Sequence, residues 1–111
     1  MGSLSDLSQP YTGIYECEKL TLGGDDVSTK FEYVRLELAY GDAFTLEYRT
    51  AEGGEGSYGG TYKMDPQKGE LTLSANTVLK TVSHKFPVKN GTILVDLNFG
   101  GKLLHAEFKM P

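Results

Sequence analysis

Few side chains in this sequence have the type and spacing that catalysis requires. Cys17, the only cysteine, and His84 both fall on predicted inward faces, where a thiol and its base could meet. A lone inward cysteine, however, more often packs as a small apolar side chain. Glu16 and Glu18 share a strand face, but no neighbour would orient them as a general acid and its partner. We therefore predict no catalytic residue and a protein that is not an enzyme.

The sequence also lacks the motifs that hold metals, nucleotides or other cofactors. The two histidines are far apart without clustered acids, which argues against a zinc site. Neither glycine-rich stretch, 23–24 or 53–56, is followed by the Lys-Ser/Thr and helix of a phosphate-binding loop. Asp25-Asp26 lacks the ligand spacing of an EF-hand. We expect no metal and no cofactor.

The most informative residues are aromatic and polarisable side chains at alternating positions of predicted strands. Buried tyrosine hydroxyls require hydrogen-bond partners, and apolar walls with a few convergent polar groups describe a ligand pocket. Two interpretations stay open: a pocket for a small ligand, or a packed core whose tyrosine hydroxyls reach the rim. The residues predicted to bind the ligand are Tyr15, Tyr48, Tyr58, Tyr62, Met64, His84 and Phe86.

The last quarter of the chain shows which elements would position these side chains. Apolar residues alternate through 82–88, 93–99 and 104–110, and glycine-containing pairs separate the three segments. Asn90-Gly91 and Gly100-Gly101 supply the positive φ angles that two-residue hairpin turns need. The pattern predicts an antiparallel meander with one dry face and one solvated face.

The same alternation predicts five further strands upstream, at 11–22, 30–40, 44–49, 58–64 and 71–73, and it extends the first segment of the meander back to residue 79. A shift in apolar phase near Glu18-Lys19 predicts a β-bulge in the first of them. Glu52–Ser57, with three glycines in six residues, is predicted to be a flexible connection. No segment keeps a 3.6-residue period, so helix should be minor.

Strands linked almost entirely by hairpins predict an all-β fold, an eight-stranded antiparallel up-and-down meander. Closing it into a barrel removes the exposed edges of an open sheet. A barrel of this size is just filled by side chains or holds one small ligand. Residues 11–111 would form this single domain, and residues 1–10 an N-terminal arm.

Three segments carry a resemblance to a known family: Tyr11-Thr-Gly-Ile-Tyr15, Gly59-Gly-Thr-Tyr-Lys63 and Gly101-Lys-Leu-Leu-His-Ala-Glu-Phe108. They resemble the small bacterial lipocalin-like (calycin) β-barrel domains. The Gly-x-Trp signature of the first strand is missing, since the chain has no tryptophan. The resemblance implies a calyx that binds a small hydrophobic or amphipathic molecule. The alternative is a filled barrel that acts as a structural or protein-interaction module.

Composition limits the partners. The 111 residues carry a net charge of −4, which argues against nucleic acid and against a polybasic membrane contact. One cysteine allows no intrachain disulfide. The sequence shows no secretory signal, so we expect a cytoplasmic protein if it is full length, and an exported one if an upstream signal was removed. We expect a monomer or a weak homodimer.

Overall fold

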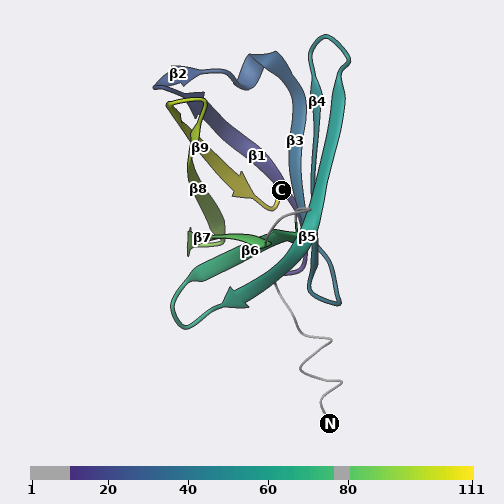
Figure 1. Cartoon of the computed structure of the whole chain (residues 1–111), viewed down its shortest axis with the longest axis vertical. Helices are drawn as coiled ribbons and strands as arrows, with labels where there is room; N and C mark the ends of the chain where they lie inside the picture. Colours follow the sequence, from purple (N-terminus) through teal and green to yellow (C-terminus); the bar gives the residue numbers. More distant parts are fainter. Residues whose placement is uncertain (1–10, 77–80) are drawn as a thin grey trace.

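The computed structural model describes residues 11–76 and 81–111, which form one antiparallel sheet (Figure 1). The strands follow one another in the sheet, and pairing between the first and last long strands closes it into a barrel. The predicted eight-stranded up-and-down barrel is confirmed; a further two-residue strand, β2, pairs antiparallel with the end of β1. The elements are β1 Gly13–Leu22, β2 Asp25–Asp26, the 3-10 turn η1 Ser28–Lys30, β3 Phe31–Leu38, β4 Ala43–Thr50, β5 Glu55–Asp65, β6 Glu70–Asn76, β7 Thr81–Lys89, β8 Thr92–Phe99 and β9 Lys102–Lys109.

Two boundaries differ from prediction. The connection predicted over Glu52–Ser57 is shorter, because β5 already begins at Glu55. Its turn is closed by the Thr50 amide, which donates to the Gly54 carbonyl oxygen at 2.7 Å. The strand predicted at 71–73 extends over the whole of β6. The predicted arm at 1–10 lies outside the described residues.

Local turn chemistry explains why the hairpins are tight. Asn90 and Gly91 have φ angles of 53° and 78°, so two successive residues are left-handed, as a type I′ turn requires. In the longer β3–β4 turn, where the Ala39 amide donates to the Ala43 carbonyl oxygen, Gly41 and Asp42 also have positive φ angles, of 83° and 62°. Such turns match the right-handed twist of the strands on either side.

The predicted bulge in β1 is confirmed and has a clear role. The register of β1 against β9 shifts between Cys17 and Lys19, leaving Glu18 without an opposite residue. The first half of β1 pairs with β3, and the second half pairs with β9. The extra residue bends β1, so that one strand lies along both neighbours and closes the barrel.

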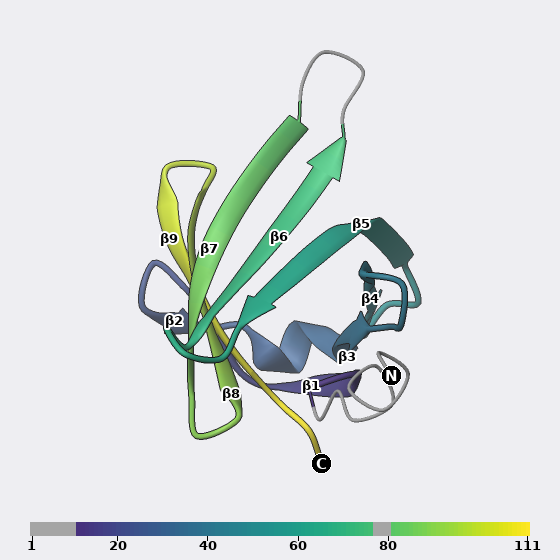
Figure 2. The same cartoon turned by 90° about the horizontal axis from the view of Figure 1, so that it is seen from below.

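Gly60 allows β5 and β6 to cross closely, away from the bulge in β1. β5 pairs with β4 as far as Thr61 and with β6 only from Thr61 onward. A side chain at Gly60 would collide with the backbone carbonyl of Ser74 on β6, so the two strands cross closely only because this residue is glycine. Beyond this crossing the β6–β7 hairpin diverges from β5 (Figure 2).

Side chains fill the closed part of the barrel. No buried residue in the described part of the chain is charged, and the only buried hydroxyls belong to tyrosines. The described residues also contain no helix long and apolar enough to cross a membrane. The core consists of Tyr15, Leu20, Leu36, Leu38, Phe44, Tyr62, Leu71, Phe86, Ile93, Val95, Ala106 and Phe108.

Candidate functional site

The residues predicted to bind a ligand separate into three groups. Tyr15, Tyr62 and Phe86 are buried in the core. Tyr48 and Met64 are half-buried, and Met64 packs against that core. Tyr58 and His84 are exposed, although both lie on strand faces that point inward elsewhere. The structure therefore does not bring all seven side chains into one enclosed pocket.

The two buried tyrosines have satisfied hydroxyls. Tyr15 donates to the carbonyl oxygen of Tyr11 at 2.6 Å, and Tyr62 donates to the carbonyl oxygen of Ala39 at 3.0 Å. Burial raises the pKa of both phenols, so they remain protonated donors. For these two residues the geometry is that of a packed core with hydroxyls that reach the rim.

The expected burial of His84 is wrong. Its register opposite Leu73 places it on the inner face, and its ring stacks beside Phe86 with centroids 6.2 Å apart. It is nevertheless exposed, because β7 pairs with β8 only at Val88 and Lys89. The β6–β7 hairpin has left the barrel wall at this point, and alternation along one strand does not reveal that departure.

Near the turn of the β4–β5 hairpin, three rings form a surface that we call the aromatic shelf: Phe31, Tyr48 and Tyr58. Tyr48 and Tyr58 stack at 6.3 Å with an interplanar angle of 23°, and Phe31 meets Tyr48 edge-on at 6.0 Å. A side chain at Gly56 would overlap the Tyr48 ring, so glycine lets that ring lie flat on β5. Tyr58 is 61% exposed.

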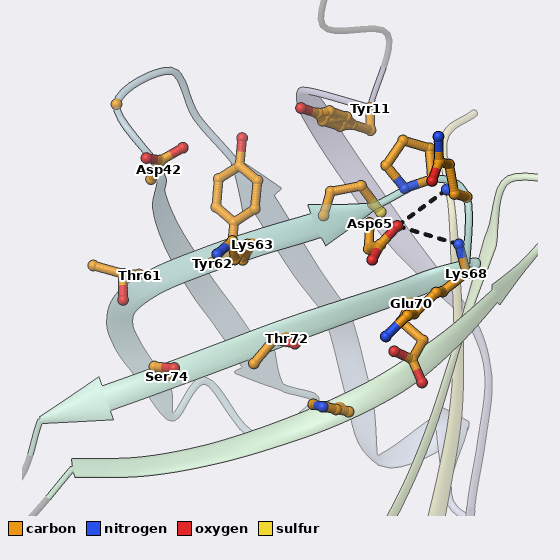
Figure 3. Close-up of a pocket in the computed structure, with 15 residues that line it drawn as sticks. Tyr11, Asp42, Thr61, Tyr62, Lys63, Asp65, Lys68, Glu70, Thr72 and Ser74 are labelled. Atoms are coloured by element: carbon orange, nitrogen blue, oxygen red, sulfur yellow. Dashed lines mark hydrogen bonds between the residues drawn. The ribbon is translucent and has the colours of Figure 1, made fainter.

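A second feature lies mostly on the outer face of β5, β6 and β7 (Figure 3). It is a groove of about 1120 Å³, bounded on one side by Tyr11 and by Asp42 of the β3–β4 turn. Thr61, Thr72 and Ser74 line its floor, and Lys63 and Lys85 also line it. Sequence reasoning missed this groove. The alternation marks these residues as solvated, but only the register between strands brings them together.

Cys17 is unsuited to nucleophilic chemistry. Its thiol donates to the Lys19 carbonyl oxygen at 3.3 Å, and its side chain packs against the core. Burial raises the pKa of the thiol to about 11, so little thiolate is present near neutral pH. Cys17 lies on β1 and His84 on β7, and these two strands are not neighbours in the sheet.

The outer face of β8 and β9 carries a clamped histidine. The two ring nitrogens of His105 lie 2.8 Å from Asp96 Oδ1 and 2.8 Å from Glu107 Oε2. The hydrogen bond to Glu107 has the larger effect and the one to Asp96 the next, and both raise the pKa of His105, because only an imidazolium can donate from both nitrogens.

Among the described residues, no group of three or more His, Cys, Asp or Glu side chains is arranged to hold a metal ion.

No protein-family model matches the sequence, and no curated protein is similar enough to match. The closed up-and-down barrel agrees with the architecture that the lipocalin-like resemblance implies.

Proposed function

We propose that this protein is a non-enzymatic, lipocalin-like binding module that holds a small amphipathic ligand on the aromatic shelf. In this proposal the filled barrel is the scaffold, and the ligand lies beside the turn of the β4–β5 hairpin. One observation carries the proposal: Tyr58 faces inward yet remains 61% exposed, stacked on Tyr48. An exposed ring that continues a stacked aromatic cluster supports a binding surface at this place.

The chemistry of the shelf supports an amphipathic ligand. The parallel rings of Tyr48 and Tyr58 offer an apolar surface on which a flat ligand group could stack. Neither of the two hydroxyls has a hydrogen-bond partner among the described residues, so both can bond to a polar group of the ligand. Tyrosine combines these two properties, which is why it is common in binding surfaces.

A second candidate function, docking of an extended polypeptide, is favoured by one edge of β5, which pairs with no described residue over Glu55–Gly59. The Tyr62 amide donates to the Asp42 carbonyl, so even-numbered residues of β5 point their backbone groups toward β4. The backbone groups of the odd-numbered residues Glu55, Ser57 and Gly59 therefore point to the opposite edge of β5. The strand β6 does not pair with β5 at these residues. An unpaired edge is a template for an added strand.

The test is titration with an apolar fluorescent probe, comparing the native protein with Tyr58→Ser. Leu103→Ser is the matched control, because Leu103 is 53% exposed on β9, away from the shelf. We expect about one probe per chain with micromolar affinity, at least tenfold weaker in Tyr58→Ser and unchanged in Leu103→Ser. Equal binding by all three proteins would contradict the shelf as the site.

Ser57→Pro separates the two candidates, because it removes an amide that faces the open edge of β5 and leaves the rings in place. Small-molecule binding on the shelf should survive this substitution. Native mass spectrometry of the purified protein then identifies the ligand: a bound small molecule supports the shelf. A bound peptide that is lost from Ser57→Pro supports strand addition instead.

A further inference from the structure

We propose that the groove on β5, β6 and β7 contains an oxyanion-binding site formed by Lys63, Thr72 and Lys85. The ligand group is a carboxylate, phosphate or sulfate on a small molecule. This site is separate from the aromatic shelf: the shelf lies on the inner face of β3, β4 and the first half of β5.

Strand register brings the three residues into one row. Thr72 on β6 is the direct partner of Lys63 on β5 and of Lys85 on β7. All three point outward, because the residues that alternate with them, such as Tyr62, Leu71 and Phe86, are buried in the core. Adjacent strands are about 4.8 Å apart, so the two lysine backbones lie about 10 Å apart with Thr72 between them. Both flexible ammonium groups can reach the space above Thr72.

Like the other lysines that the structure describes, Lys63 and Lys85 have no acidic partner. In the part of the chain that the structure describes, Arg35, Arg49 and His105 all lie within 4 Å of a carboxylate, but Lys63 and Lys85 form no ion pair. Two unneutralised cations on either side of one residue repel each other. An oxyanion between them would remove that repulsion and accept hydrogen bonds from both.

The rest of the groove supplies neutral hydrogen-bond donors next to this row. Thr61, Ser74 and Ser83 form the neighbouring row across the same strands. The Ser74 and Ser83 hydroxyl oxygens are 2.7 Å apart, so one hydroxyl donates a hydrogen bond to the other. A ligand oxygen above Thr72 can therefore meet hydroxyl groups as well as ammonium groups.

The acids of the groove restrict how the ligand lies. Asp65 accepts hydrogen bonds from the amides of Gln67 and Lys68, both at 3.2 Å, and so stabilises its own turn (Figure 3). Glu70 lies beside Asp65 at that end of the groove, and Asp42 lies on the opposite wall. The anionic group should therefore bind at the lysine row. Hydroxyl or amino groups of the same ligand would extend toward Asp42.

The experiment is an NMR titration of the ¹⁵N-labelled protein with inorganic phosphate, followed by glucose 6-phosphate and glucuronate. We expect saturable shifts at Lys63, Thr72 and Lys85, with a millimolar dissociation constant for phosphate alone. Lys63→Gln/Lys85→Gln should weaken binding at least fivefold. The control Lys30→Gln/Lys89→Gln removes the same charge outside the groove and should bind as the native protein does.

Equal loss in both double variants, or shifts that never saturate, would overturn the proposal, because either result means general screening of surface charge. The two sugars then distinguish the source of the oxyanion. Tighter binding of glucose 6-phosphate indicates a phosphorylated ligand, and tighter binding of glucuronate indicates a carboxylate. Tyr58→Ser should bind phosphate normally, so the oxyanion site and the aromatic shelf can fail independently.

Discussion

At the scale of single residues, burial and hydrogen bonding decide which polar groups can react. Burial raises the pKa of the Cys17 thiol, whereas hydrogen bonds to Glu107 and Asp96 raise the pKa of His105. Neither environment resembles an activated nucleophile with its base. Both residues instead report on the packing around them, and both can be tested in solution.

Cys17 should react slowly with thiol reagents. A pKa of about 11, against about 8.5 for a free cysteine, lowers the thiolate fraction at pH 8 by about two orders of magnitude. The native protein should therefore react with a disulfide reagent at least 100 times more slowly than the same protein in denaturant. A native rate near that of the denatured protein would show that Cys17 is neither buried nor packed on the core.

His105 should make stability depend on pH. Its folded pKa lies above the unfolded value of about 6.5, so its stabilising contribution is fully present below pH 6.5 and is lost as the pH rises through the folded pKa. Chemical denaturation from pH 5.5 to 9 should show this loss, and His105→Gln should remove it.

Asp96→Asn combined with Glu107→Gln provides the check on this interpretation. Without the two acceptors, an NMR titration should find the pKa of His105 lower than in the native protein. An unchanged His105 titration in the double variant would mean that the two carboxylates do not hold the proton.

At the scale of strands, the barrel depends on two places where one strand changes partner. β1 passes from β3 to β9 through its bulge at Glu18, and β5 passes from β4 to β6 at Gly60. At the second place, one edge of β5 is left without a partner among the described residues over Glu55–Gly59. The shelf and the free edge of β5 are consequences of the second one.

Gly60→Ala should destabilise the fold more than a typical surface change. The added methyl group would collide with the Ser74 carbonyl, which is backbone and cannot rotate away, and would also press on the Phe44 ring. We expect a loss of about 2 kcal/mol or more in the free energy of unfolding, in the range of overpacking. Gly59→Ala is the control: its nearest contact, the Phe44 carbonyl, is at 3.4 Å, so its effect should be clearly smaller.

At the scale of the whole molecule, stability should come from the filled interior. Leu71 is 0% exposed at the centre of that core. Leu71→Ala removes its packing and leaves a cavity, and should cost about 2–5 kcal/mol of unfolding free energy. Leu103→Ala makes the same chemical change on the surface and should cost less than about 0.5 kcal/mol. Urea denaturation followed by far-UV circular dichroism measures both, and equal losses would contradict a single packed core.

The sequence by itself determined the strands, their inward faces, the tight turns and the bulge. These features are local: a period of two fixes which side chains share a face, and Asn90-Gly91 or Gly41-Asp42 fix a turn through their own φ angles. The all-β meander and its closure followed from counting such elements. Tyr15, Tyr62 and Phe86 were placed correctly on the inner face for the same reason.

Only the tertiary structure decided which inward positions are covered and which outward positions meet. His84 and Tyr58 obey the alternation but are exposed, because β7 leaves β8 and β5 leaves β6 along their length. The row of Lys63, Thr72 and Lys85 depends on the register of three strands, which the turns and the packed core set together. The burial of an inward side chain and the register between strands depend on several strands at once, so the residue pattern of one strand does not predict them.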